Sequence, residues 1–244
     1  MEIIRMNNFA ASMLCNGRNE DAIRYLQNAL AGLRGVVNHV GTNETRSHPP
    51  CSSCQHGCHG CHREEPQAPL NITAVQNEEL TEDGTVQNAF EFYDKVFLIS
   101  NTQTHCCCPA QLEKLQHMLL AVITYNLGTV SQRMGIQYGK SWHFAKAMRF
   151  YELSFSTIEN VLQEYGFDGN LIMLLCSLYN NMGHIHARSN DIEDTKFCLE
   201  WLQRTVNAEE FSNCNAMCDD DYCFFSQYLM FSSTHNHFRS APAA

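Results

Sequence analysis

Asn126-Leu127-Gly128 and Asn181-Met182-Gly183 are the two stretches that decide the fold, and Asn8-Phe9-Ala10 has the same form. In each, an Asn is followed by a large apolar residue and then by a small one. Each stretch lies midway along a segment with helical periodicity. The small residue is expected to let a partner helix approach closely, while the apolar residue fills the adjoining gap. The recurrence therefore predicts three helix pairs of similar design.

Apolar residues recur at three- and four-residue steps around these stretches, which predicts amphipathic helices. The expected pairs cover 4–15 with 19–35, 110–134 with 141–164, and 169–188 with 191–206. A break in the second pair is expected at Gly135–Gly139. Asp191 is a candidate N-cap for the last helix of the third pair. One further helix is expected over 219–232, and its body, which is apolar almost all round, should be covered by something.

Residues 39–109 separate the first pair from the second and differ from both in composition. The front part, 41–87, is rich in small and polar residues and is expected to be largely disordered. In residues 89–99, aromatic and β-branched residues flank Asp94-Lys95, a pattern typical of a short hairpin with a tight turn. The expected organisation is a first helix pair over 1–38, this insertion, two helix pairs over 110–206, and a loop, capping helix and tail over 207–244.

With these motifs the chain resembles the tetratricopeptide-repeat family. That family pairs an apolar-small step on the first helix with a small–bulky–small pattern on the second. The residues that match the second-helix pattern are Ala22, Leu26 and Ala29, then Ala147, Tyr151 and Ser154, and more loosely Thr195, Leu199 and Leu202. The resemblance implies an all-α fold of about three antiparallel helix pairs, stacked as a short right-handed solenoid with a C-terminal capping helix.

The resemblance also implies a function, a scaffold that binds a protein or peptide partner in a concave groove lined by the first helices. The positions that map to this groove are Asn8, Asn126, Thr129, Arg133, Asn181, His184 and Arg188. An Asn carboxamide donates and accepts at once, so it can hold an extended peptide backbone. The two Arg residues would favour an acidic peptide. In the alternative interpretation, the Asn residues bond within the repeat and the Arg residues form solvated ion pairs.

Residues 51–62 contain four Cys and three His, which are the side chains that zinc prefers as ligands. Cys51, Cys54, Cys58 and Cys61 form two C-x₂-C pairs. Only three residues separate the pairs, whereas structural zinc sites place a dozen or more between them. A biased insertion without metal is therefore the favoured interpretation. Soft-metal (zinc) binding, or thiol redox chemistry, remains as an alternative function.

Composition and motifs exclude several other classes of function. The 244-residue chain has 16 basic and 26 acidic residues, and its net charge of −10 disfavours nucleic acid. It has no apolar stretch of about 20 residues, so no membrane partner is expected. No secretory signal is visible, and the 13 Cys then indicate a reducing compartment, the cytoplasm with the nucleus also allowed. Because common catalytic and phosphate-binding motifs are missing, no enzyme activity or cofactor is expected.

Overall fold

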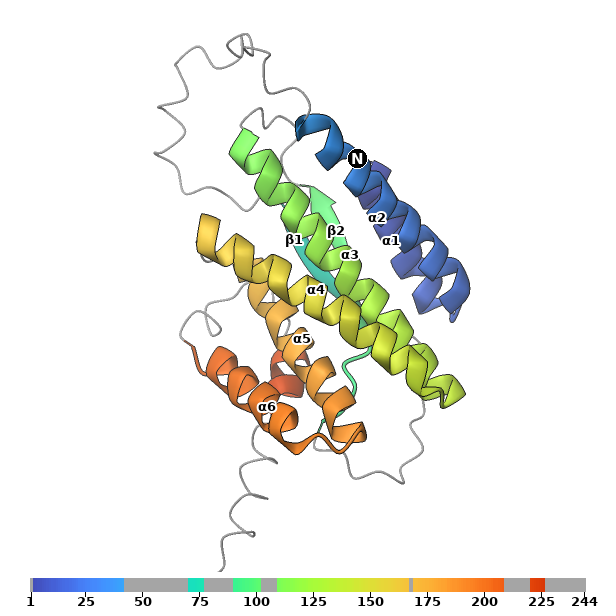
Figure 1. The fold of residues 1–244 in the computed structure, drawn as a ribbon, viewed down its shortest axis with the longest axis vertical. Coiled ribbons are helices and arrows are strands. Elements are labelled where there is room, and N and C mark those ends of the chain that lie inside the picture. The colour runs from blue at the N-terminus through green and yellow to red at the C-terminus, as the bar shows by residue number, and fades with distance from the viewer. Residues whose placement is uncertain are drawn as a thin grey trace, which may run out of the picture.

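The computed structural model describes residues 2–41, 70–76, 90–101, 109–166, 169–208 and 220–226. These residues are mostly helical, and the longer helices form three consecutive pairs (Figure 1). The pairs are α1 (Glu2–Cys15) with α2 (Asn19–Gly41), α3 (Pro109–Tyr138) with α4 (Ser141–Tyr165), and α5 (Gly169–Arg188) with α6 (Ile192–Val206). Because α2 also packs on α3 and α4 on α5, the pairs stack in chain order. The predicted stack of helix pairs is confirmed.

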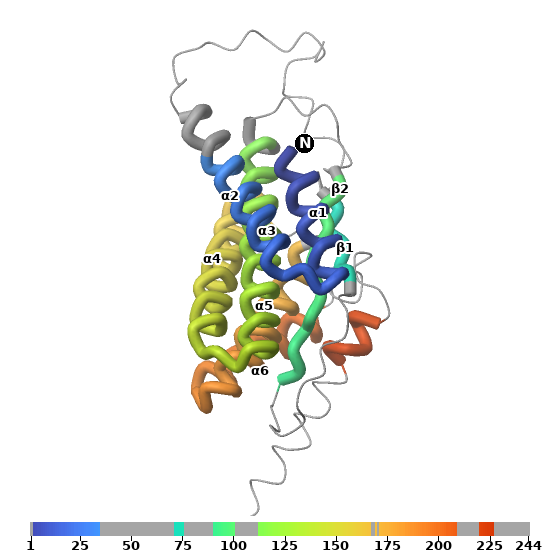
Figure 2. The backbone as a smooth tube through the Cα atoms, turned by 90° about the vertical axis from the view of Figure 1, so that its right-hand side faces the viewer, coloured from blue at the N-terminus to red at the C-terminus, as the bar shows by residue number. Residues whose placement is uncertain are grey.

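The middle helix α3 lies at the centre of the molecule. Nearly every residue from Met118 to Gly135 is buried, since α3 contacts α1, α2, α4, α5 and a strand. Figure 2 shows the strands running along one side of the helices, with α4 on the other. The buried Thr and Ser hydroxyl groups of α3 donate within the helix, as Thr124 does to the Leu120 carbonyl at 2.7 Å and Ser131 to the Leu127 carbonyl at 2.7 Å.

Two glycines of α3 allow α4 to lie close. A Cβ on Gly128 would stand 2.4 Å from the ring of Tyr151, which confirms the role predicted for the small residue of the second pair. The break expected over Gly135–Gly139 is confirmed only at its end, because α3 continues to Tyr138. Gly135 instead makes room for Phe144, whose ring would lie 3.0 Å from a Cβ there. The turn falls at Gly139, whose φ of +63° suits glycine.

A two-stranded antiparallel sheet accompanies the helices, formed by β1 (Leu70–Gln76) and β2 (Lys95–Asn101). The hairpin predicted within 89–99 is therefore wrong. Residues 90–99, which we call the extended segment, run in one direction through Asp94 and Lys95. Their partner strand comes from 41–87, the part expected to be largely disordered. Of that part, Gly41 ends α2, and residues 42–69 and 77–87 lie outside the described residues.

The ends of the third pair and the C-terminal helix follow the sequence closely. Asp191 is the N-cap of α6, and its carboxylate accepts a hydrogen bond from the Asp194 amide, as predicted. Of the helix expected over 219–232, residues 220–226 are described and helical. Phe225 is buried there, as expected of a covered helix, whereas Tyr222 is 46% exposed.

Candidate functional site

One Asn from the first helix of each pair bonds to the extended segment. The Asn8 carboxamide donates to the Ile99 carbonyl at 2.7 Å and accepts from the Ile99 amide at 2.9 Å. Asn126 makes the same two bonds with Phe97, each at 2.9 Å. Asn181 makes them with Tyr93, at 3.0 and 3.1 Å. The helices α1, α3 and α5 thus form a row of carboxamides, which we call the Asn row, and each member holds both backbone groups of one residue.

Two further bonds complete the pattern along the extended segment. The Glu91 carbonyl accepts from Asn180 at 2.7 Å, and the Lys95 carbonyl accepts from the Tyr125 hydroxyl at 3.3 Å. The residues bonded to helices are therefore every second one from 91 to 99. In an extended strand, alternate residues present their backbone groups to opposite edges. The remaining backbone groups of β2 consequently face β1. One edge of β2 therefore bonds to β1, and the other edge bonds to side chains of the helices.

The Asn row is part of a buried polar network. Asn7, Asn126 and Asn181 are fully buried. Asn7 accepts from Asn126 at 3.0 Å and also donates to the Phe97 carbonyl at 3.0 Å. Asn181 is within 3.2 Å of the Tyr125 hydroxyl and 3.3 Å of the Tyr151 hydroxyl. Hydrogen bonds in such a low-dielectric environment are strong when every group has a partner, and costly when one is removed.

Burial also keeps the two tyrosines of this network protonated. Loss of solvation raises the pKa of Tyr125 and of Tyr151 well above the ordinary value, and the neighbouring Tyr125 adds to the effect on Tyr151. Both therefore remain neutral hydroxyl groups throughout the ordinary pH range. The network can keep its hydrogen bonds without a change of charge.

The side chains of the extended segment fill the space between the helices and the strand. Its buried apolar residues, each at most 7% exposed, are Phe90, Phe92, Tyr93, Val96, Phe97 and Ile99. Phe90 occupies the space beside Gly183, where a Cβ would stand 2.4 Å from its ring. The small residue of the third pair therefore makes room for the extended segment and not for the partner helix, which corrects the prediction for that position.

The predicted groove residues divide into those that contact the extended segment and those that do not. Besides Asn8, Asn126 and Asn181, Arg133 contacts it through Asp94 at 3.2 Å, and His184 through the ring of Phe92 at a centroid distance of 5.9 Å. Thr129 donates to the Tyr125 carbonyl inside α3. Arg188 is exposed and lies over the ring of Phe144.

Sequence reasoning missed several contacts that the structure places beside these residues. Asn7 and Asn180 each precede a predicted Asn, so the doubled Asn was a visible signal. Tyr125 precedes Asn126 in the same way. The sequence around Asp221 did not indicate a contact with the extended segment. Asp221 belongs to a run of three acidic residues, and such a run is also typical of the start of a helix.

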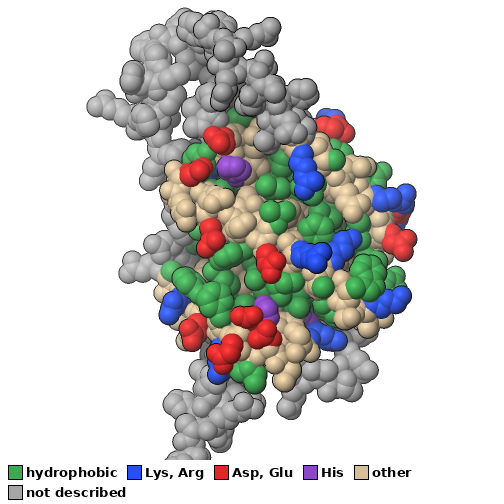
Figure 3. Space-filling model, viewed as in Figure 1, with side chains coloured by type: hydrophobic (Ala, Val, Ile, Leu, Met, Phe, Trp, Pro, Cys, Tyr) green, Lys and Arg blue, Asp and Glu red, His purple; other side chains and the backbone are tan. Residues whose placement is uncertain are grey.

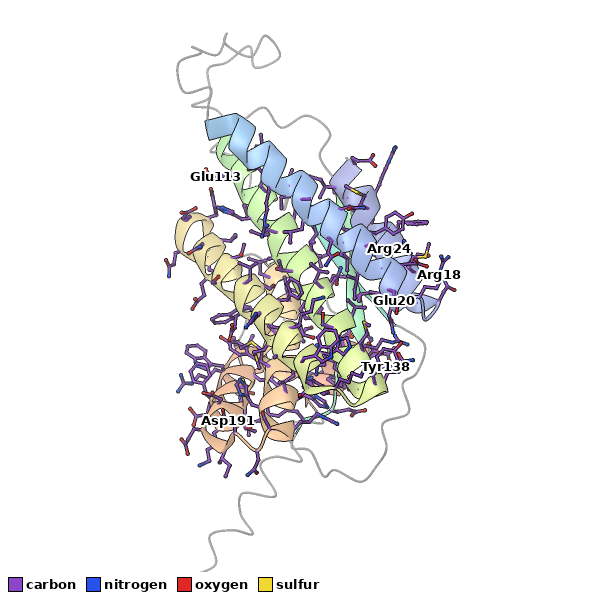
Figure 4. The ribbon with its side chains drawn as sticks, turned by 45° about the vertical axis from the view of Figure 1, so that its right-hand side comes forward. Arg18, Glu20, Arg24, Glu113, Tyr138 and Asp191 are labelled. Atoms are coloured by element: carbon purple, nitrogen blue, oxygen red, sulfur yellow. The ribbon has the colours of Figure 1, made fainter. Side chains whose placement is uncertain are left out.

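Exposed charged side chains form pairs near the start of α2 and at the α5–α6 turn. Arg18 and Arg24, both labelled in Figure 4, pair with Asp21 at the start of α2. Asp191 lies at the α5–α6 turn, where acidic side chains gather on the surface (Figures 3 and 4). Such exposed pairs contribute little to stability. The buried charges around the extended segment are of a different kind.

Cys, His and Asp side chains are candidate metal ligands in several parts of the chain. The cluster Cys51–His62 lies outside the described residues, and so do Cys106–Cys108, Cys214 and Cys218. Within the described part of the chain, His186, Asp191 and Asp194 bring three ligand atoms within 4.8 Å of one another. Asp191 already serves there as the N-cap of α6, and both carboxylates are largely exposed. Helix capping accounts for the position of the Asp191 carboxylate.

The described cysteines differ sharply in expected reactivity. Cys198 is 1% exposed, and burial raises the pKa of its thiol to about 12, whereas Cys223 is exposed. Iodoacetamide at pH 8 is therefore expected to alkylate Cys223 and to spare Cys198, because the thiolate is the nucleophile. Peptide mass spectrometry measures both sites, and alkylation in denaturant should remove the difference. Equal labelling of the two in native protein would contradict the burial of Cys198.

Comparisons with protein-family models, with curated proteins and with solved structures found no match for this chain. Among the helices that the structure describes, none combines the length and the apolar character needed to cross a bilayer. The geometry of the Asn row is therefore the main guide to function.

Proposed function

We propose that this chain is a protein-interaction scaffold, built like a tetratricopeptide array, whose groove recognises the backbone of an extended peptide. The observation that carries the proposal is the Asn row, in which Asn8, Asn126 and Asn181 each bond both backbone groups of a single residue. Bonds of this kind do not depend on the side chain that the residue carries. They suit any chain that enters in the extended conformation, and neighbouring pockets then supply specificity.

In this proposal the extended segment is a resident ligand that an external peptide must displace. The segment is tethered to the array, so its effective concentration at the groove is on the order of millimolar. An external peptide is at a disadvantage, because its apparent affinity falls with the fraction of molecules whose groove is open. The scaffold is thus closed by default, and its partner either arrives at high local concentration or binds more tightly than the segment.

The proposal assigns no catalytic role and no cofactor to the groove. The buried charged groups there are paired, Arg133 with Asp94 and Lys95 with Asp221. This environment suits recognition of a chain better than chemistry on a small substrate, which needs access to a reacting group.

A labelled peptide of residues 88–101, added to the full-length protein, tests the proposal by fluorescence anisotropy. In a Phe90→Ala/Phe97→Ala chain the resident segment loses two buried rings, while the Asn row stays intact. The peptide is expected to bind this chain at least about tenfold more tightly than the wild type. Adding Asn126→Ala and Asn181→Ala should abolish the gain, and a scrambled peptide serves as the control.

Hydrogen exchange on the wild-type protein gives an independent result that does not depend on how the variant folds. Excess peptide should speed exchange at the amides of Tyr93, Phe97 and Ile99, since it holds the groove while the resident segment is released. Two results together would rule out the groove as a peptide site: a folded Phe90→Ala/Phe97→Ala protein that does not bind the peptide, and hydrogen exchange in the wild type that the peptide does not change.

A further inference from the structure

Two buried charges of opposite sign face consecutive residues of the extended segment. Arg133 on α3 is 4% exposed, and its Nη1 lies 3.2 Å from Asp94 Oδ2. Asp221, in the short helix 220–226, is 3% exposed, and its Oδ1 lies 2.6 Å from Lys95 Nζ. An acidic residue and the basic residue after it are thus each matched by a counter-charge, and the two counter-charges come from distant parts of the chain.

The two counter-charges lie on opposite faces of the extended segment. Successive side chains of a strand point to opposite faces, so Tyr93 and Lys95 share one face and Asp94 lies on the other. Both residues of the first face bond to Asp221 Oδ1, the Tyr93 hydroxyl at 2.7 Å and the Lys95 ammonium at 2.6 Å. The Tyr93 ring also packs on Phe224 and Phe225, with centroids 5.1 and 5.0 Å away.

This arrangement fixes the register of the bound chain. A slip by one residue in one direction would put Lys95 against Arg133, and a slip in the other would put Asp94 against Asp221. Either slip places like charges together in a buried environment, which is strongly unfavourable. The Asn row alone would tolerate a slip by two residues, because it reads only the backbone.

We infer that the groove selects an extended peptide in which an aromatic residue, an acidic residue and a basic residue follow one another. The inference rests on the proposed function, since it assumes that the groove accepts a chain from outside. The acidic residue lies against Arg133, and the basic residue lies against Asp221. A peptide that is neutral or reversed at these positions removes the charge that Asp94 places against Arg133 and the charge that Lys95 places against Asp221, and such peptides are rejected.

Three labelled peptides of residues 88–101 test the selection on the full-length Phe90→Ala/Phe97→Ala protein. One has the native sequence, one carries D94K/K95D, and one carries D94N/K95Q. The exchanged peptide has the same composition and net charge as the native one, so it controls for non-specific attraction. It is expected to bind at least about tenfold more weakly, and the neutral peptide also more weakly than the native one.

The resident segment gives a second measurement, independent of any added peptide. In the full-length protein, D94K/K95D should speed hydrogen exchange across residues 91–99 by at least about tenfold, whereas the charge-conserving D94E/K95R should stay close to wild type. Equal affinity for the native and exchanged peptides, or equal exchange in the two chain variants, overturns the inference. If no peptide binds at all, the proposed function fails, and the exchange rates still decide whether the order of charges matters.

Discussion

Asn126→Ala and Asn181→Ala are each expected to lower the free energy of unfolding by about 2–4 kcal/mol. Asn181→Ala leaves the buried N–H and carbonyl of Tyr93 without the carboxamide that bonds them. Asn126→Ala leaves the buried N–H of Phe97 without its carboxamide, and the Phe97 carbonyl keeps only the bond from Asn7. Both Asn side chains are fully buried, so water has no ready path to replace them. Urea denaturation followed by circular dichroism measures the loss.

Asn8→Ala is the matched control for these two variants. Asn8 makes the same pair of bonds, with Ile99, but it is only partly buried. Water can take over its bonds, so the expected loss is about 1 kcal/mol or less. If Asn8→Ala lowered the free energy of unfolding as much as Asn126→Ala does, burial would not explain the cost of removing these bonds.

Gly128→Ala and Gly183→Ala are expected to destabilise the protein by about 1–3 kcal/mol each, and the corresponding Leu variants by more. In both positions a Cβ would stand 2.4 Å from a ring atom, of Tyr151 in the first case and of Phe90 in the second. The rings are fully buried, so they have little room to move. Thermal and urea unfolding of the two variants measure the effect.

Gly32→Ala provides the opposite expectation within the same fold. A Cβ there would lie 3.6 Å from the nearest atom, Ile3 Cγ1, which is ordinary contact. The change should therefore stabilise the protein by about 0.5–1 kcal/mol through helix propensity.

Gly183→Ala should also speed amide hydrogen exchange near Phe90, because the added Cβ displaces the Phe90 ring. A neutral Gly183→Ala would mean that the close packing on the extended segment is wrong.

The helical architecture was predictable because its signals are local. Apolar periodicity, the Asp191 cap and the small residue at Gly128 each act within one helix or between neighbours in sequence. Gly135 was misjudged as a helix break, since a glycine needed for close approach and a glycine needed for a turn look alike in sequence. The packing of Phe144 distinguishes them, and only the folded structure supplies it.

The sequence predicted that the Asn residues contact an extended backbone, but it did not predict that this backbone belongs to the same chain. The residues Asn8, Asn126 and Asn181 were expected to hold extended backbone, and they hold backbone of the same chain. Asp94-Lys95 looked like a turn because two charged residues interrupted an apolar stretch. They stay extended because Arg133 pairs with Asp94 and Asp221 pairs with Lys95. These partners lie 39 and 126 residues away in sequence, which is farther than any local sequence pattern reaches.

The position of the extended segment also determines the order in which the molecule can assemble. Helix pairs join residues close in sequence, and such contacts form early. The bonds from Asn8 to Ile99, from Asn181 to Tyr93 and from Asp221 to Tyr93 span 91, 88 and 128 residues. During synthesis the aromatic segment emerges before α5 and Asp221, so it stays uncovered while the chain is most prone to aggregate. We expect closure of these long loops, and not helix formation, to limit the rate of folding.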